Sequence, residues 1–295
     1  MLTDTPVIVH AALNGARAWW DGAAVPVADE HVVADALTAW DAGAAVIHLQ
    51  AREPDGTPSV RAERYVPLVE GIRAGGCDAI LNLACGPCEG RAIGVDVYDC
   101  ARLRPELVSL DCGTPGAGHA TMDQPIEVLR ELVAAFTKTA TSLQIECTKA
   151  SHVLTALQLR DEGLLSDPLR FQLVLGAEGA PATIEQALYM RSLVPPDAVW
   201  SICTHGGAQL RLNMLCLIAD GHIRTGLADN IWLVEDVPAT NGELVERVVR
   251  IVDELDRPLA TPDEAREILC LNEANAPRVD DEDGWPGDQL QSQVA

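Results

Sequence analysis

Two polar side chains end the apolar run in AGAAVIHLQARE, residues 42–53. Side chains alternate along a strand, so His48 and Gln50 point to the same side of the chain. Two inward polar groups on a buried strand indicate a metal site or a catalytic strand end. Zinc takes imidazole, thiolate or carboxylate ligands, and the neutral amide of Gln50 is a poor donor. The pair therefore predicts a functional strand end without a complete metal site.

Other apolar runs of strand length are also followed by residues that can bind a ligand or carry a proton. These candidates are His10, Asn14, Arg52, Cys85, Asp111, Glu146, His205, Arg224 and Asp229. A histidine taken alone is more often a hydrogen-bonded structural residue than a ligand. Several such residues at successive strand ends favour one shared site.

The elements that would position these residues are strands and helices in alternation. Eight strands are expected at Val7–Ala12, Ala45–Gln50, Ala79–Ala84, Leu107–Cys112, Ser142–Cys147, Phe171–Leu175, Val199–Cys203 and Ile223–Leu227. Helical periodicity between them predicts helices at His31–Asp41, Arg61–Ala74, Gln124–Lys138, Thr183–Ser192, Gln209–Ile218 and Asn241–Leu255. Eight right-handed crossovers predict a closed (β/α)8 TIM barrel, whose strand C-termini build the active site. An open doubly wound sheet is the alternative.

The chain is expected to be a single α/β domain over residues 1–275, because no linker-like stretch interrupts the alternation. Thr261-Pro262-Asp263-Glu264 supplies an N-cap, a proline at the first helical position and acidic groups in the first turn. A closing helix is therefore predicted from there to about Leu271. Residues 276–295 are acidic and polar, and we expect a flexible tail.

The net charge and the hydropathy of the chain limit the classes of molecule and membrane that it is expected to bind. The 295 residues hold 21 Lys and Arg against 44 Asp and Glu, a net charge of −23, which argues against nucleic-acid and anionic-membrane binding. No run approaches the ~20 apolar residues of a membrane span, and no basic segment precedes the first apolar run, so a cytoplasmic location is expected. The nine cysteines are an odd number and do not indicate a disulfide framework.

The segment AGAAVIHLQAREPDGTPS resembles the AGA-x-x-x-H-x-H-x-R-x-x-x-G-x-P-S pattern of the β-keto acid cleavage enzymes, a family that includes the 3-keto-5-aminohexanoate cleavage enzyme. The similarity continues through FQLVLGAEGAPAT, GHIRTGLADN and TNGELVERVVRIVDELDRPLATPDEAREIL. The resemblance implies a (β/α)8 barrel that cleaves a β-keto acid with acetyl-CoA through an enolate, giving acetoacetate and a new CoA ester. It also implies a homo-oligomer.

The zinc site that the resemblance implies is degenerate in this sequence. The family holds zinc with both histidines of H-x-H and with the glutamate of G-x-E-D-N, positions occupied here by His48, Gln50 and Ala228. One ligand of three is present, so no zinc is expected at the family position. Either the chemistry has changed or it has been lost.

Two turns also depart from the family pattern. A Ser-Thr-Gly-Gly-like turn is replaced by Ala84-Cys85-Gly86-Pro87, in which proline removes a backbone N–H that could bind an anion. The family's G-x-G-R corresponds to Thr204-His205-Gly206-Gly207, without the basic side chain expected near coenzyme A. Acetyl-CoA is therefore only a possible co-substrate.

The resemblance assigns Arg224 and Asp229 to the pair that takes part in deprotonating the substrate, and we expect a close ion pair at the rim of the barrel. Glu146 is expected to bind a substrate ammonium or to shuttle a proton, or else to be a buried partner of an arginine. Without zinc, His48 would donate a hydrogen bond or carry a proton with a pKa near neutrality. Both His48 and Gln50 would then face a cavity lined by Glu146 and Arg224.

The predicted site therefore has a catalytic group and a substrate-binding group. The catalytic residues are Arg224, Asp229, Glu146 and His48. The substrate-binding residues are Gln50, Arg52, Asn14, Asp111, Cys85, Gly86 and His205. Two other hypotheses remain for these residue types: a redox C-x-x-C at 85–88, and a relocated metal site using His48, Cys85 or Cys88, and His10 or His205.

The function expected from the sequence is making or breaking a C–C bond in a small β-keto acid or related carboxylate. The alternative is a non-catalytic scaffold that keeps the barrel and binds a carboxylate. The charged residues retained at the strand ends favour the enzyme, because a scaffold has no evident need for them.

Overall fold

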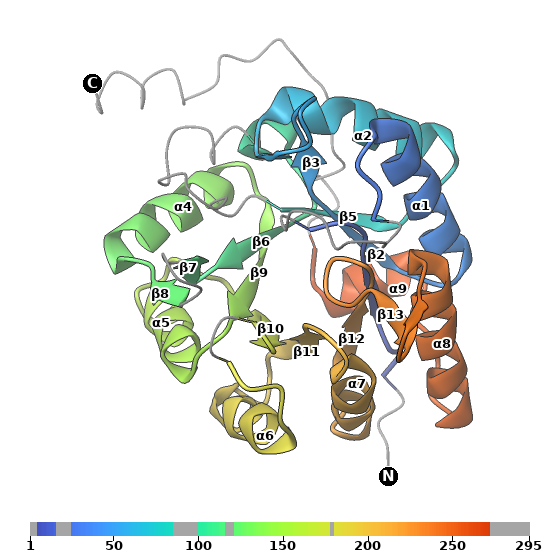
Figure 1. Ribbon diagram of the computed structural model, residues 1–295. Helices are drawn as coiled ribbons and strands as arrows, with labels where there is room; N and C mark the ends of the chain where they lie inside the picture. The colour runs from blue at the N-terminus through green and yellow to red at the C-terminus, as the bar shows by residue number, and fades with distance from the viewer. Residues whose placement is uncertain (1–4, 16–24, 85–99, 116–120, 178–179, 272–295) are drawn as a thin grey trace.

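A closed barrel of eight parallel strands forms the centre of the molecule (Figure 1). The computed structural model describes residues 5–15, 25–84, 100–115, 121–177 and 180–271. The barrel strands are β1 (Val9–Ala12), β2 (Val46–Leu49), β5 (Ile80–Ala84), β6 (Leu107–Asp111), β9 (Ser142–Cys147), β10 (Arg170–Leu175), β11 (Val199–Thr204) and β12 (His222–Thr225). They neighbour one another in chain order, and β12 closes on β1. The (β/α)8 barrel is confirmed, and closure excludes the open sheet.

Helices surround the barrel in a ring (Figure 1). They are α1 (Asp29–Asp41), α2 (Ala62–Ala74), α4 (Ile126–Lys138), α5 (Ala150–Asp161), α6 (Ile184–Leu193), α7 (Gln209–Ile218) and α8 (Asn241–Glu254), with a 3-10 turn η1 at Cys100–Leu103. All six expected helices are present, with ends displaced by at most two residues. The helix α5 was not predicted. Its buried positions include His152, so its apolar periodicity is weak in the sequence.

The two faces of each strand have different chemistry. Residues such as Val9, Ile47 and Leu81 belong to the main apolar core, together with helix residues such as Tyr65 and Leu68. These positions therefore face the helices, and the alternate positions face the barrel interior. Midway along the strands the interior positions are polar and buried: His10, His48, Asn82, Ser109, Gln144, Gln172, Ser201 and His222. The barrel thus carries a buried polar band.

The N-terminal end of the barrel is closed by an apolar plug. Ile8, Val46, Ile80 and Leu107 cluster there with residues of and around the short helix α9 (Pro262–Ile268). A capping box at Thr261 begins α9, as its sequence predicts. The guanidinium of Arg170 donates to the carbonyls of Leu269 and Cys270, which fixes the end of this helix against β10.

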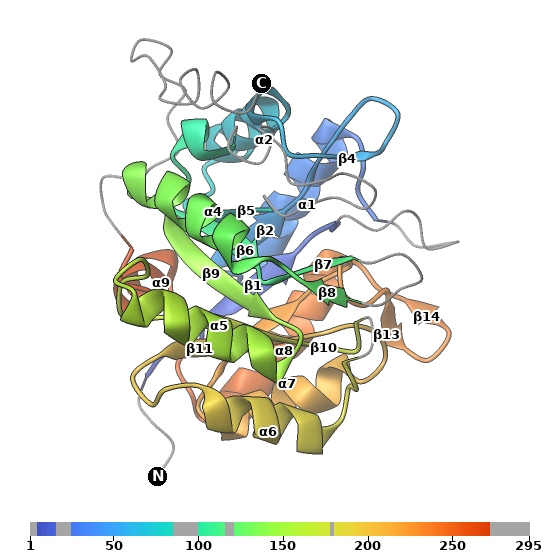
Figure 2. The same cartoon turned by 90° about the vertical axis from the view of Figure 1, so that its left-hand side faces the viewer.

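Three small hairpins lie at the opposite end, where the strands terminate (Figure 2). They are β3–β4 (Ala51–Arg52 and Pro58–Ser59), β7–β8 (Gly113–Pro115 and Thr121–Asp123) and β13–β14 (Trp232–Val234 and Val237–Pro238). Each hairpin follows a barrel strand, so the loops that carry function in this fold are partly ordered by their own pairing. No helix in the described ranges combines the length and hydropathy needed to cross a membrane.

One glycine allows β12 to pass close to β1. Gly226 has φ +134°, and a Cβ at this position would stand 2.2 Å from the carbonyl oxygen of Ala12. Its own carbonyl accepts from the backbone N–H groups of Asp229 and Asn230, which turns the loop back toward the barrel. A side chain would push this loop away from β1.

We predict that Gly226→Ala lowers the free energy of unfolding by at least about 2 kcal/mol, because backbone strain and a clash with backbone both act. Chemical denaturation followed by circular dichroism measures it. Gly207→Ala is the matched control, since Gly207 has an ordinary φ and a Cβ there would meet nothing within 4 Å. Equal stability of the two variants would contradict the role assigned to Gly226.

Candidate active site

The buried guanidinium of Arg224 connects several side chains near the C-terminal ends of the barrel strands. Arg224, inward on β12, donates from Nε and Nη2 to the two carboxylate oxygens of Asp229, at 2.9 and 3.0 Å. Its Nη1 donates to Glu146 Oε1 on β9, at 3.1 Å, and to Gln172 Oε1 on β10, at 2.7 Å. The predicted Arg224–Asp229 ion pair is confirmed. Four of the five guanidinium N–H groups are occupied by protein acceptors.

The Arg224–Asp229 ion pair is buried, whereas we expected it from the sequence at the rim of the barrel. Asp229 is fully buried, and Arg224 is 6% exposed. Burial alone would raise the pKa of Asp229, but Arg224 outweighs it and the pKa lies below its ordinary value. The pKa of Arg224 is raised, because its two carboxylates outweigh the cost of its burial. By formal charge, one guanidinium facing two carboxylate side chains leaves one excess negative charge.

Two buried histidines lie beside this cluster. His10 is the strand neighbour of Arg224 across β1 and β12, and His48 on β2 neighbours Ala12. Burial, with Arg224 adding to it, lowers the pKa of His48 to about 3. Burial and then the charges of His222, Arg224 and His48 hold the pKa of His10 well below its ordinary value. The expectation that His48 titrates near neutral pH is therefore wrong. Both rings are neutral at physiological pH.

Gln50 does not point its amide nitrogen at the Arg224 cluster. This nitrogen donates to the carbonyl of Ser59, at 2.6 Å, and to the hydroxyl of Tyr65 on α2, at 3.3 Å. The hydroxyl of Tyr65 in turn donates to the carbonyl of Ala84. The amide thus joins the β3–β4 hairpin to the helix layer. The N–H groups of Gln50 therefore already have protein partners, and its expected contact with substrate stays a prediction.

Asn14 and Arg52 also make structural contacts. The side chain of Asn14 accepts from the backbone N–H of Gln50 and donates to its carbonyl. The guanidinium of Arg52 donates to the carbonyl of Gly56 in the hairpin turn and to that of Gly15 after β1. Together they hold the β3–β4 hairpin against the end of β1. Their expected substrate contacts remain untested.

Asp111 ends β6 and His205 directly follows β11, so both lie at the C-terminal end of the barrel, on strands that are not neighbours. Asp111 is paired in register with Glu146 and accepts from the backbone N–H of Gly113. His205 follows β11, with its Nδ1 4.0 Å from Asp229 Oδ1 and its Nε2 4.0 Å from Cys203 Sγ. The structure therefore brings His205 into the Arg224–Asp229 cluster. Cys85, Gly86 and the C-x-x-C at 85–88 lie outside the described residues.

Two members of the site were not found by sequence reasoning. Gln172 accepts from Arg224, and Cys203 lies beside His205, yet both sit within apolar strand sequences. Strand alternation could have identified both residues. Each alternates along its strand with core residues such as Phe171, Leu173 and Ile202, so each faces the barrel interior. Listing the inward residues of every strand would have found them.

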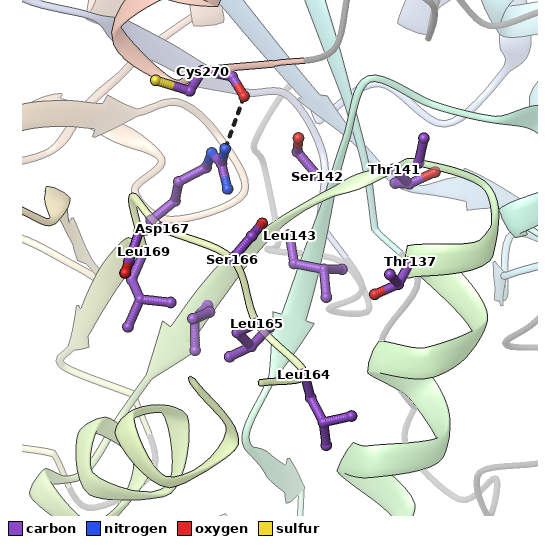
Figure 3. A pocket seen from close by; sticks show the side chains of 13 residues that line it. Thr137, Thr141, Ser142, Leu143, Leu164, Leu165, Ser166, Asp167, Leu169 and Cys270 are labelled. Atoms are coloured by element: carbon purple, nitrogen blue, oxygen red, sulfur yellow. Dashed lines mark hydrogen bonds between the residues drawn. The ribbon is translucent and has the colours of Figure 1, made fainter. Parts of the chain in front are cut away.

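A pocket of about 340 Å³ lies at the other end of the barrel (Figure 3). Its lining includes the start of β9 at Ser142, the end of α4 and the loop before β10, with Arg170 donating to Cys270 across it. In this fold the N-terminal end of the strands serves stability. The pocket is therefore separate from the Arg224 cluster.

The family model of the β-keto acid cleavage enzymes matches residues 6–271 of the chain. The chain belongs to this family. It is 34% identical over 276 residues to the 3-keto-5-aminohexanoate cleavage enzyme of Acetoanaerobium sticklandii, covering 90% of this chain and 98% of the relative. It is 31% identical over 272 residues to the 3-oxoadipate:acetyl-CoA acetyltransferase of Cupriavidus necator, covering 90% and 95%.

A solved structure described as a binary complex of ObcA with oxaloacetate has the same fold. It superposes with a TM-score of 0.71 at 19% identity, over 84% of this chain and 67% of that one. At this level of identity, the similarity shows a shared barrel fold and nothing about function.

The zinc position of the β-keto acid cleavage enzymes does not fit a metal in this chain. Of the three positions that the family pattern assigns, His48 retains an imidazole, with its Nδ1 buried and without a hydrogen-bond partner in the described structure. The amide nitrogen of Gln50 is engaged by Ser59 and Tyr65. Ala228 has no donor atom and packs against Gly15. One donor does not make a zinc site.

We predict that the buried histidines make the fold sensitive to mild acid. Because the folded pKa of His48 is about 3 against an ordinary 6.5, unfolding takes up a proton below about pH 6.5, and stability falls as the pH decreases from there toward 3. Each such histidine contributes up to about 1.4 kcal/mol per pH unit. His48→Asn should flatten the dependence of unfolding free energy on pH between 6.5 and 5. The exposed His31→Gln should not, and equal slopes in both variants would refute this account.

We also predict that Arg224→Ala destabilises the fold by about 3–5 kcal/mol, because it leaves Asp229 buried without a counter-charge. Adding Asp229→Asn should restore part of this loss at pH 7, since the uncompensated charge is then gone. Urea denaturation of the single and double variants measures both steps. If the double variant is less stable than Arg224→Ala alone, charge compensation is not what holds this cluster.

Proposed function

We propose that the chain makes or breaks a carbon–carbon bond in a small β-keto acid, with acetyl-CoA as the co-substrate to test first. Membership in the β-keto acid cleavage enzymes supports the reaction class. The observation that carries the proposal is the buried Arg224, held by Asp229 and Glu146 at the end of the barrel where this fold places catalysis. The proposed reaction does not use the family zinc position.

Glu146 is the proposed general base. A general base must be accessible to the substrate, and a lowered pKa makes a carboxylate a weaker base. Both oxygens of Asp229 accept from Arg224, and the side chain is fully buried with a lowered pKa. Glu146 gives Arg224 one oxygen and is 19% exposed. It is therefore the more accessible carboxylate for taking a proton from the carbon next to the keto group.

His48 is proposed to stabilise the enolate that this proton transfer leaves. The charge of an enolate develops on the former keto oxygen, where a fixed N–H donor lowers the barrier. His48 is neutral because of its burial, and a neutral imidazole keeps one N–H, which the enolate oxygen would take over from Asn82. The enolate carbon would then attack the acyl carbon of acetyl-CoA, and the carbon–sulfur bond would break to release coenzyme A as a thiolate. Attack of this thiolate on the keto carbon would break the bond between that carbon and the acylated carbon, giving a new CoA ester and acetoacetate, which takes back the proton from Glu146. Arg224 orients the two carboxylates and has one N–H left over.

The excess negative charge of the Arg224–Asp229–Glu146 cluster would favour a substrate that carries a positive charge. A keto acid that carries an amino group, as in the name of the Acetoanaerobium relative, would place its ammonium beside Glu146 favourably. A dicarboxylate, as in the name of the Cupriavidus relative, would add negative charge to a negative site. The proposed substrate class is therefore a β-keto acid with a cationic group.

We predict turnover of 3-keto-5-aminohexanoate with acetyl-CoA, and at least tenfold lower kcat/KM for 3-oxoadipate. Mass spectrometry of the acyl-CoA product measures both. Glu146→Gln should lower kcat about 10²–10⁴-fold, the usual contribution of a general base. Glu162→Gln is the matched control, since Glu162 also pairs with an arginine, Arg130, but on the outer helices.

Two results would count against this function. Full activity of Glu146→Gln would remove Glu146 as the base. Saturable binding of the keto acid without any turnover, in a protein that holds its native circular dichroism spectrum, would favour the non-catalytic alternative instead.

A further inference from the structure

Three metal-ligating side chains converge beside Arg224 at a place that the family zinc pattern does not use. Cys203 faces inward near the end of β11, His205 follows that strand, and Asp229 comes from the loop after β12. One ligand atom from each lies within 4.8 Å of the other two. Cys203 and Asp229 are buried, and His205 is partly exposed. Three types of donor from two neighbouring strand ends thus surround one point.

The chemistry of this set suits zinc. Zinc is borderline in softness and accepts thiolate sulfur, imidazole nitrogen and carboxylate oxygen, whereas calcium and magnesium prefer oxygen alone. Catalytic zinc sites commonly use three protein ligands and leave a fourth position open. His205 is partly exposed whereas Asp229 is fully buried, so solvent reaches this set of side chains from the His205 side.

We propose that Cys203, His205 and Asp229 bind one divalent metal ion, with zinc the best match. Ligands about 2.0–2.3 Å from a tetrahedral zinc stand roughly 3.3–3.7 Å apart. One ligand atom from each residue lies within 4.8 Å of the other two, so a shift of up to about 1.5 Å would bring all three onto one ion. The two 4.0 Å separations involve different ring nitrogens, Nε2 toward Cys203 and Nδ1 toward Asp229. Rotation of the partly exposed His205 ring can supply that movement, with one ring nitrogen as the ligand.

The surroundings also fit a metal. Arg224 Nη2 uses one lone pair of Asp229 Oδ1 and leaves another, and a hydrogen-bonded carboxylate is the usual form of an acidic ligand. Val174 and Ala177 pack against Cys203, which gives the site a dry wall. The charges also balance: a dication and Arg224 offset the thiolate, Asp229 and Glu146, so the excess negative charge disappears.

A metal here would lie in the cluster that contains the proposed base, where it could polarise a keto oxygen. That use rests on the proposed function, but the binding of the metal does not. The two can fail separately, because metal binding is measured without substrate.

The test uses the full chain after removal of metal with a chelator. Zn²⁺ is titrated in competition with a chromophoric chelator, and Co²⁺ is added in parallel. About one metal per chain is expected, with a sulfur-to-cobalt charge-transfer band in the near ultraviolet from Cys203. Cys203→Ser should abolish that band. Cys203→Ser and His205→Gln should each weaken zinc binding at least about tenfold, since even a residue that only supports a ligand costs that much.

Matched controls are Cys216→Ser, a buried thiol that donates to the carbonyl of His222, and the exposed His31→Gln. Neither should change zinc affinity. If Cys203→Ser does not fold, His205→Gln carries the test. The proposal is overturned if the folded chain binds no zinc, if both site variants bind it normally, or if His48→Ala alone removes it, which would return the metal to the family position.

Discussion

The burial of one positive charge sets the geometry of the C-terminal end of the barrel. Taking a guanidinium out of water costs several kcal/mol unless its hydrogen bonds are replaced. Arg224 replaces them with partners from β9, β10 and the loop after β12, so these elements must be in register before the charge is satisfied. Gly226 lets the loop approach β1 closely enough for Asp229 to reach back. Fold and site therefore constrain each other at this point.

Burial, with the charge of Arg224 adding to it, determines the protonation state of the two histidines. His10 and His48 lie in the polar band of the barrel, and their burial together with the field of Arg224 keeps them neutral. Neutral imidazoles donate or accept single hydrogen bonds without adding positive charge. The negative charge of Asp229 and Glu146 is then offset by Arg224 alone. A positively charged ligand is what this arrangement attracts, whether a metal ion or the ammonium of a substrate.

How far the sequence predicts this site depends on the range of the interactions. The eight strands follow from local patterns, and the Arg224–Asp229 pair follows from the resemblance of GHIRTGLADN to the family motif, which lies within one segment. The partners of Gln50 and Arg52 do not, since they are backbone carbonyls of Ser59 and Gly56, whose positions depend on the hairpin. The lowered pKa of His48 likewise depends on a distant strand. Cys203 was missed because an inward thiol looks like core.

The family zinc position is closed by packing and not merely short of ligands. At Gln50, an amide bridges the hairpin to α2, and a histidine there would leave the carbonyl of Ser59 without its present donor. At Ala228, a methyl group rests against Gly15, which has φ +54° and must remain small. Restoring two ligands would thus disturb two structural contacts. Cys203, His205 and Asp229 need a smaller rearrangement, because one ligand atom from each already lies within 4.8 Å of the other two. On the proposal made above, a metal ion would therefore be accommodated at lower structural cost beside β11 than at the end of β2.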